Sequence, residues 1–598
     1  TYNSPAEGLA RVLRSIDAQS LHPREFEVVF VDDGSTDDTP ARLAALARHR
    51  PNVVVHRIPN SGWASRPRNV GVSLARGEYV LFMDHDDELL PTGLERAYEF
   101  GHRHGADVVN AKEVRTTGWS WAWDVFSADV GTVSSVDPNP LIPMTPHKLY
   151  RRAFLLEQDV TFPEGKRVLW EDIYFNTLAF ARGARVAVLS SYALYHWVIG
   201  PQNTSKSFGR DITELWRNLE SVLDYIATEL AGRAGRDELL AYQFRSRVLA
   251  FLGPRSLGRT PEQYAIAYAA ARRLLARYES VGLDARLPAV DRARLGLLRA
   301  DRPDAQRALA ELDRDVTALP ELAGIEWDGS RLVLSVTMTL LAGPDEPLRL
   351  VRDGERWLRP LPEPVAAALP PEALDVTADL ARARVALSVK GRSSRSTWPI
   401  ESDGTVDVTP DGRVVATVTG RFDALGFGPA HDLTDGVWDF AARLEVLGYV
   451  VHRGLRGGRD VAALLSGRPV AGYVNRDGLF SLDVGGTVRS VVTAAGLRPE
   501  DVAVTSDGRS AGRTSLTARA ALPTVHNAGQ TDLAGQALLG PDHRAPARLA
   551  GGPGGASLTF TARLPDGRYP LRVRLNGRTA EAGVQLVVRG PQVEVTPA

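Results

Sequence analysis

The stretch Gly77-Glu-Tyr-Val-Leu-Phe-Met-Asp84-His-Asp86-Asp87-Glu88 decides how the first part of this chain folds. Residues 79–83 read as a buried strand, and four acids follow it between Asp84 and Glu88. Carboxylates crowded at a strand end repel one another strongly unless a cation lies among them, and a hard divalent metal is the natural partner. The alternative is a solvated acidic loop that starts the next helix, and this motif alone indicates both equally.

Around this stretch, apolar runs alternate with helical patterns. Residues 4–19 have the apolar spacing of a helix, while 26–31 and 53–57 read as parallel strands covered on both faces. Strands that alternate with helices imply a doubly wound, Rossmann-like parallel sheet, in which ligands bind beyond the carboxyl ends of the strands. This rule gathers the polar side chains that follow the strands, namely Asp33, Asn60, Arg68, Asp84 and Asp86.

These side chains have the functional groups that a sugar nucleotide requires. An aspartate such as Asp33 can accept a hydrogen bond from a base, and Arg68 can offer a fork of donors. Asp86 can hold a metal that bridges a diphosphate. The alternatives are an ordinary capped turn at Asp33 and a surface ion pair at Arg68.

Six motifs, in this order and spacing, resemble family 2 glycosyltransferases of the GT-A fold. They are Thr1-Tyr2-Asn3, Val31-Asp-Asp-Gly-Ser35, Asn60-Ser-Gly, Arg66-Pro-Arg-Asn69, Ala75-Arg-Gly-Glu-Tyr79 and Asp84-His-Asp-Asp87. The resemblance implies a UDP-sugar donor and a Mn or Mg cofactor. It implies that Tyr2, Asp33, Asn60 and Arg68 hold the uridine, that Asp84 lies by the ribose, and that Asp86 ligates the metal. The motifs begin at Thr1, so we expect the first strand of the domain to precede it.

The second half of this domain, which we expect to span residues 1–208, should supply the catalytic base. Glu171 and Asp172 open a predicted helix, where acids are favourable in any protein. The resemblance implies that Asp172 is the catalytic carboxylate and that Glu171 lies at the substrate. It also places Lys148 near phosphate and makes His196 a second metal ligand, although a lone histidine is more often structural.

Three tryptophans, Trp119, Trp121 and Trp123, alternate along the chain in this second half. In a strand, alternate side chains share one face of the sheet. Such a face could stack on the sugar rings of an acceptor, or it could belong to the hydrophobic core, which we favour slightly.

Composition restricts the partners. The chain has 71 basic and 72 acidic residues and a net charge of −1, so it has no general attraction to nucleic acid. It has no cysteine, which excludes disulfides, thiolate nucleophiles and zinc–thiolate sites. We find neither a signal peptide nor an apolar run of about 18 residues, the length of a membrane span. We therefore expect a cytoplasmic protein without a transmembrane segment, which could work at the inner face of the membrane.

Three further domains are expected, because 598 residues exceed the size of one hydrophobic core. Apolar spacing and a capping box at Thr260-Pro-Glu-Gln263 predict a helical linker over 209–318. Alternating patterns with Asp-Gly turns then predict two immunoglobulin-like β-sandwiches, at 319–458 and 470–598. Leu433-Thr-Asp-Gly-Val-Trp438 recurs as Leu564-Pro-Asp-Gly-Arg-Tyr569, which suggests two copies of one unit.

This order of domains resembles the wall teichoic acid poly(ribitol-phosphate) N-acetylglucosaminyltransferases. Specific points of likeness are Asn60-Ser-Gly, Arg66-Pro-Arg-Asn69 and Thr145-Pro-His-Lys-Leu-Tyr-Arg151. The resemblance implies inverting transfer of N-acetylglucosamine from UDP-GlcNAc to a polyol-phosphate wall polymer, by a homotrimer assembled through the C-terminal pair. Two alternatives stay open: a capsular or lipid-linked oligosaccharide as acceptor, or a carbohydrate-binding protein with an inactive transferase domain.

Overall fold

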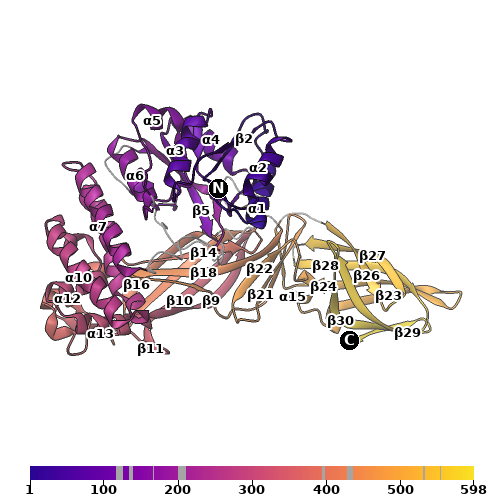
Figure 1. Ribbon diagram of the computed structural model, residues 1–598. Coiled ribbons are helices and arrows are strands. Elements are labelled where there is room, and N and C mark those ends of the chain that lie inside the picture. The colour runs from indigo at the N-terminus through magenta and orange to yellow at the C-terminus, as the bar shows by residue number, and fades with distance from the viewer. Residues whose placement is uncertain are drawn as a thin grey trace. The chain divides into compact units, whose positions relative to one another are not determined.

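The computed structural model describes residues 1–115, 125–133, 139–165, 167–199, 211–393, 397–426, 435–528, 532–552 and 554–598 (Figure 1). The chain divides into two compact units. The first joins Thr1–Val316 to Leu350–Ala381, and the second joins Thr317–Arg349 to Arg382–Ala598. Trp119, Trp121 and Trp123 lie outside the described residues. Within the described ranges, every helix is too short or too polar to cross a lipid bilayer.

The first unit begins with an α/β domain. Its elements are α1 (Ala6–Asp17), β1 (Val28–Asp32), α2 (Thr39–Ala47), β2 (Val53–Arg57), α3 (Ser65–Leu74), β3 (Tyr79–Leu81), β4 (Glu88–Leu89), α4 (Gly93–His104), β5 (Val108–Arg115), β6 (Val130–Val133), β7 (Leu149–Arg151), α5 (Arg152–Glu157), α6 (Glu171–Ala181) and β8 (Val186–Trp197). β1 and β2 pair in parallel, as the apolar runs predicted. Leu9, Phe30 and Leu43 bury the facing sides of α1, β1 and α2 in one cluster.

β1 and β2 form a two-stranded sheet of their own, and the strands from β3 to β8 form a second sheet that is mixed rather than parallel. β3 pairs antiparallel with β7, β7 pairs antiparallel with β5, and β5 pairs in parallel with β8. The reason is that β7 enters the sheet after a long connection and runs against its neighbours. Short apolar runs do not encode strand direction, so the periodicity could identify these strands but not this pairing.

An aromatic cluster fixes α6 beside the end of β3. Phe82, directly after β3, meets Phe162 edge to face with ring centroids 5.0 Å apart. Phe162 stacks on Phe175 of α6 at 3.9 Å. All three rings are buried in one cluster, which extends into the following helices. The first turn of α6 is therefore held close to the acids that follow β3.

The helical linker packs on this domain through the same cluster. Its elements are α7 (Ile212–Glu229), α8 (Arg236–Gln243), the π-helix η3 (Phe244–Leu249), α9 (Ala250–Leu252), η4 (Pro254–Gly258), α10 (Pro261–Tyr278), η5 (Glu279–Val281), α11 (Leu283–Arg286), α12 (Ala289–Arg299) and α13 (Pro303–Arg314). The predicted capping box is present, because the Thr260 side chain accepts from the backbone N–H of Gln263 and Gln263 caps the Thr260 N–H in return.

Residues 350–381 pack against the helical linker and are joined to it by buried ion pairs. This segment contains β12 (Val351–Asp353), β13 (Arg356–Leu358), η6 (Ala366–Ala368), η7 (Pro371–Leu374) and α14 (Thr377–Leu380). Asp313 of α13 accepts from Arg359 at 2.9 Å and from Arg294 of α12 at 2.7 Å. The side chain of Asp313 is 1% exposed, so this carboxylate neutralises two buried cations.

The second unit contains two sheets that form a sandwich, followed by a third sheet. One sheet contains β9 (Thr317–Asp328), β10 (Arg331–Gly343), β11 (Glu346–Pro347), β16 (Glu401–Val408) and β17 (Val414–Asp423). The other contains β14 (Arg384–Gly391), β15 (Thr397–Pro399), β18 (Gly436–Val446), β19 (Tyr449–Gly454), β20 (Val461–Leu465), β21 (Arg468–Val474), β22 (Phe480–Val484) and β25 (Val525–Ala528). β21 and β22, which the sequence assigned to the second sandwich, pair into the sheet of β18 instead. Alternation along a strand does not identify its partner.

The third sheet is antiparallel. Two short helices, α15 (Val491–Ala494) and η8 (Pro499–Asp501), precede it. Its strand order is β23 (Val502–Ser510), β24 (Arg513–Leu522), β28 (Gly555–Leu564), β27 (His543–Gly552), β26 (Asp532–Leu539), β29 (Gly567–Leu575), β30 (Arg578–Arg589) and β31 (Gln592–Pro597). The outer strands β23 and β31 contact each other, so the sheet curls into a nearly closed, barrel-like sandwich.

We predict that Asp313→Ala destabilises the first unit by about 3–5 kcal/mol, because removing one partner leaves buried cations without a counter-charge. Urea unfolding of the full chain, followed by tryptophan fluorescence, measures the change. The matched control is Asp315→Ala, since Asp315 pairs with Arg314 at the surface and is 49% exposed. A shift for Asp313→Ala no larger than that of the control would contradict the prediction.

Candidate active site

Arg68 joins the two acidic positions that the sequence singled out. It lies in α3, and its Nη1 donates to Glu171 Oε1 at 2.6 Å while its Nη2 donates to Asp84 Oδ1 at 3.0 Å. Burial acts to lower the pKa of Arg68, but Asp84 and Glu171 outweigh it and hold the pKa above its ordinary value. Trp63 Nε1 donates to the other oxygen of Glu171 at 3.0 Å. The acids after β3 and the acids that open α6 are therefore parts of one site.

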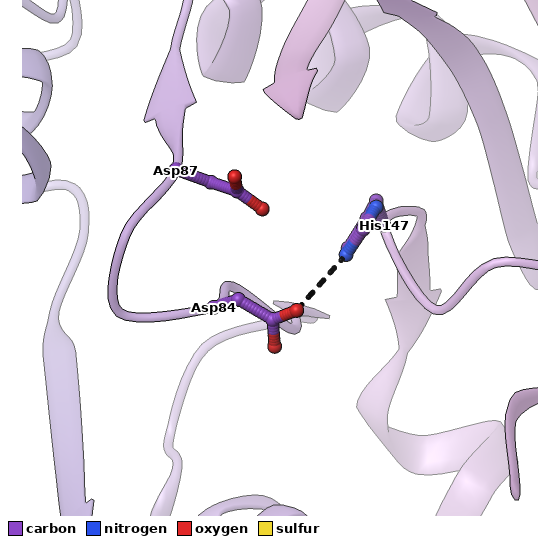
Figure 2. A group of neighbouring side chains, drawn as sticks. All are labelled: Asp84, Asp87 and His147. Atoms are coloured by element: carbon purple, nitrogen blue, oxygen red, sulfur yellow. Dashed lines mark ion pairs between the residues drawn. The ribbon is translucent and has the colours of Figure 1, made fainter. Parts of the chain in front are cut away.

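A histidine that the sequence did not single out lies behind Asp84. His147 Nδ1 is 2.8 Å from Glu113 Oε2, and its Nε2 is 3.9 Å from Asp84 Oδ2 (Figure 2). Its ring stacks on Tyr195 at 3.8 Å. Burial acts to lower the pKa of His147, but Glu113 and Asp84 raise it to about 9. The motif Thr145-Pro-His-Lys contains this histidine, but from this motif the resemblance implied a role for Lys148 and none for His147.

Asp87 is the buried member of the acidic turn. Its Oδ2 accepts from the Tyr195 hydroxyl at 2.6 Å, and its Oδ1 accepts from the backbone N–H of Val198 at 2.7 Å. Burial, with Asp84 as the next cause, raises the pKa of Asp87 to about 8. Asp87 thus ties the acidic turn to β8, and periodicity could not indicate this contact because it joins distant segments.

The donor atoms in this turn fit a hard divalent cation. Asp84, Asp87 and His147 place one ligand atom each within 4.8 Å of one another (Figure 2). His147 Nε2 is buried without a hydrogen-bond partner among the described residues, and its Nδ1 meets a carboxylate, as in many metal-bound histidines. Oxygen and imidazole ligands suit Mn, and oxygen ligands suit Mg.

Of the two predicted metal ligands, Asp86 lies within this turn and His196 lies on the neighbouring strand β8. Asp86 is half-buried, burial raises the pKa of its carboxyl group, and no described side chain donates a hydrogen bond to it. His196 Nδ1 instead lies 2.9 Å from Glu88 Oε2, because β4 and β8 pair these two residues. The free carboxylate of Asp86 therefore stays available to a cation, whereas His196 already has an acidic partner.

Asp172 lies in the first turn of α6, directly after Glu171. Its Oδ1 accepts from the backbone N–H of Ile173 at 2.9 Å. Burial raises the pKa of Asp172 to about 6, and the adjacent Glu171 acts in the same direction. A carboxylate with such a pKa is ionised at neutral pH and is still basic enough to accept a proton.

Two of the residues expected at the nucleotide, Asp33 and Asn60, lie in contact with each other. Asp33 accepts from Ser61 N at 2.9 Å and Ser61 Oγ at 3.0 Å, and Asn60 Nδ2 donates to the Asp33 carbonyl at 2.8 Å. Gly34 is required here, since its φ is +70° and an added Cβ would lie 2.6 Å from Asn60 N. Tyr2 is 46% exposed at the same edge of the domain. The assignment of these residues to uridine stays a prediction.

Lys148 lies differently from the expectation. Its side chain is fully buried, and Nζ donates to the carbonyls of Pro143 at 2.5 Å and Thr145 at 2.7 Å. Burial lowers its pKa to about 7. An ammonium group that is committed to backbone carbonyls supports the loop before β7, and this geometry gives no support to a contact with phosphate.

Comparison with known proteins gives a consistent result. Residues 1–154 match the model of glycosyl transferase family 2, and residues 213–310 match that of the glycosyl transferase TarS linker domain. The chain is 32% identical over 259 residues to poly(ribitol-phosphate) beta-N-acetylglucosaminyltransferase TarS of Staphylococcus aureus, which covers 42% of this chain and 43% of the relative. It is 31% identical over 198 residues to the poly(ribitol-phosphate) beta-glucosyltransferase of Bacillus spizizenii, 33% of this chain and 31% of the relative.

The alignments thus span less than half the length of these curated relatives. Among solved structures, S. aureus TarS 1-349 in complex with UDP-GlcNAc is similar at 27% identity and a TM-score of 0.45, over 58% of this chain and 96% of that chain. Residues 1–154 are therefore similar to glycosyl transferase family 2, and residues 213–310 are similar to the TarS-type linker domain.

Proposed function

We propose that this chain is an inverting, metal-dependent glycosyltransferase that moves a sugar from a UDP-sugar to a hydroxyl group of a polyol-phosphate wall polymer. The observation that carries the proposal is the Arg68 bridge, which links Asp84 to Glu171 and so brings the acidic turn and Asp172 into one site. Inverting transfer needs a base on one side of the sugar and charge stabilisation on the other. Asp172 is proposed to supply the base, and the acidic turn after β3 is proposed to supply the charge stabilisation.

Asp172 is the proposed base. Its carboxylate accepts the proton of the acceptor hydroxyl while that oxygen bonds to the anomeric carbon and the bond from this carbon to UDP breaks. The attack comes from the face opposite UDP, so the configuration inverts. The raised pKa of Asp172, about 6, strengthens it as a base at neutral pH.

The acidic turn is the proposed leaving-group side. Asp86 is the proposed metal ligand, and Asp84, Asp87 and His147 are further candidate donors. A divalent cation, Mn or Mg, would stabilise the negative charge on the departing diphosphate when bound. Tyr2, Asp33, Asn60 and Arg68 are proposed to hold the uridine end, with Glu171 keeping Arg68 in place.

The acceptor and the sugar are proposed from the relatives. Two of them are named for poly(ribitol-phosphate), one as an N-acetylglucosaminyltransferase and the other as a glucosyltransferase. N-acetylglucosamine is the proposed sugar, and glucose is the second candidate. A homotrimer is proposed from the resemblance of the domain order alone, and light scattering of the full chain tests it.

We predict that UDP release depends on metal and on acceptor. The full chain is incubated with UDP-GlcNAc, UDP-Glc or UDP-Gal, with Mn or EDTA, and with or without poly(ribitol-phosphate). UDP-GlcNAc with Mn and polymer should release UDP fastest, and EDTA should abolish the release. Equal rates with and without Mn would contradict a metal-dependent transferase, and no release from any donor would contradict the enzyme itself.

Replacement of the base should remove turnover and spare binding. Asp172→Asn is expected to lower kcat by about 10²–10⁴-fold, the usual contribution of a general base, while UDP-sugar affinity measured by calorimetry changes little. In the wild-type chain, kcat/KM should fall about tenfold per pH unit below pH 6, because protonated Asp172 cannot accept a proton. The control is the exposed Glu157→Gln on α5. Parallel loss of binding and turnover in Asp172→Asn would refute the assignment.

Metal affinity distinguishes a site built on Asp86 from a site built on Asp84, Asp87 and His147. Asp86→Asn should weaken Mn binding in the presence of UDP by at least tenfold, measured by calorimetry, because it removes a charged oxygen ligand. His147→Gln keeps the size of the side chain and should have a smaller effect. The opposite order would mean that Asp84, Asp87 and His147 hold the metal.

A further inference from the structure

The linker contributes one charged side chain to the surroundings of Asp172. Between α8 and α9 the helix widens into η3, a π-helix of six residues, Phe244–Leu249. Such turns are rare and occur often at functional sites, because they turn one side chain out of the regular helical direction. Arg247 lies in this π-helix. It belongs to the linker domain and not to the matched transferase residues 1–154.

Arg247 is held in place by two contacts. Its guanidinium carbon lies 4.7 Å from the centroid of the Trp170 ring, a cation–π distance. Its Nε donates to Gln243 Oε1 at 2.8 Å. Gln243 is itself 1% exposed, and its amide nitrogen lies 3.5 Å from Met144 Sδ. The guanidinium of Arg247 is therefore held by a hydrogen bond from its Nε to Gln243 and by the Trp170 ring against one of its faces.

Trp170 connects this arginine to the base. It directly precedes α6 and has a φ of 61°, a left-handed conformation that is unfavourable for a non-glycine residue. The stacked guanidinium thus lies over the residue that begins the helix of Asp172. Arg247 and Asp172 also interact through their charges. Burial lowers the pKa of Arg247 while Asp172 raises it, and Arg247 in turn acts to lower the pKa of Asp172.

The other charged groups around Asp172 are already committed. Glu171 on the same helix is an anion that accepts from Arg68, and Arg68 of α3 is shared between Glu171 and Asp84. Lys148, beside β7, donates to two backbone carbonyls. Tyr150 of β7 donates to Asn176 at 3.0 Å. Among the described residues, none accepts a hydrogen bond from the Nη atoms of Arg247. Of the cations near Asp172, Arg247 therefore has the fewest other hydrogen-bond partners for its charged group.

We propose that Arg247 is a positioning residue for Asp172: the linker places a cation beside the base, which keeps the carboxylate ionised and oriented at neutral pH. The inference rests on the proposed role of Asp172. It also gives the linker a part in the reaction besides connecting domains, because the transferase domain alone would lack this charge.

The test is the pH profile of kcat/KM for UDP release by the full chain, with UDP-GlcNAc, Mn and poly(ribitol-phosphate), from pH 5 to pH 9. Arg247→Met keeps an unbranched apolar stem on Trp170 and removes the charge. It should move the acid limb upward by about one pH unit, the usual effect of losing a nearby opposite charge. Activity at pH 6 should then fall about fivefold, and the two profiles should converge above pH 8.

Two further variants separate charge from packing. Arg247→Lys retains the charge and should restore most of the wild-type acid limb. Arg273→Met removes an exposed charge from α10 and should leave the profile unchanged. If the unfolding midpoint of Arg247→Met is lower than that of the wild-type chain, Arg247→Gln is measured in its place.

An acid limb of Arg247→Met or Arg247→Gln that coincides with the wild-type limb would overturn the inference, even if activity fell equally at every pH, since equal loss indicates a structural role. A wild-type chain that releases no UDP would contradict the proposed function, and the inference with it. An active wild-type chain with an unshifted variant would contradict the inference alone.

Discussion

One buried guanidinium, that of Arg68, is the interaction on which the site depends. It donates to Asp84 from one direction and to Glu171 from another, and the side chains of Arg68 and Glu171 are 14% and 12% exposed. Removing one partner of such a pair costs about 3–5 kcal/mol, because the other charge stays buried. The first turn of α6, and Asp172 with it, is thereby held against the acidic turn that follows β3.

Packing supports the same arrangement. Phe82, Phe162 and Phe175 press α6 against the end of β3, and their cluster continues into α7 and α10 of the linker. The transferase domain and the linker therefore share one hydrophobic core. A shared core explains how a linker residue such as Arg247 can be held beside Trp170 with fixed geometry.

The sequence predicted that the polar side chains after the strands would lie close together. The structure pairs Asn60 with Asp33 and Arg68 with Asp84, and their roles at the nucleotide stay predictions. The sequence did not predict the partners behind them: Glu113 and Tyr195 reach His147 and Asp87 from β5 and β8, through contacts that no local pattern encodes. For the same reason the sequence could not show that the buried Lys148 donates to backbone carbonyls, or that β22 pairs with β18.

In the proposed mechanism Asp172 activates the acceptor while the acidic turn stabilises the leaving group of the same sugar. A crystal structure of the full chain with UDP-GlcNAc and Mn is the decisive test. We expect the diphosphate and metal at Asp86, and the Asp172 carboxylate on the opposite face of the sugar, where an attacking oxygen would lie within about 3 Å of it. A sugar whose open face points away from Asp172, or a diphosphate remote from Asp86, would contradict the account.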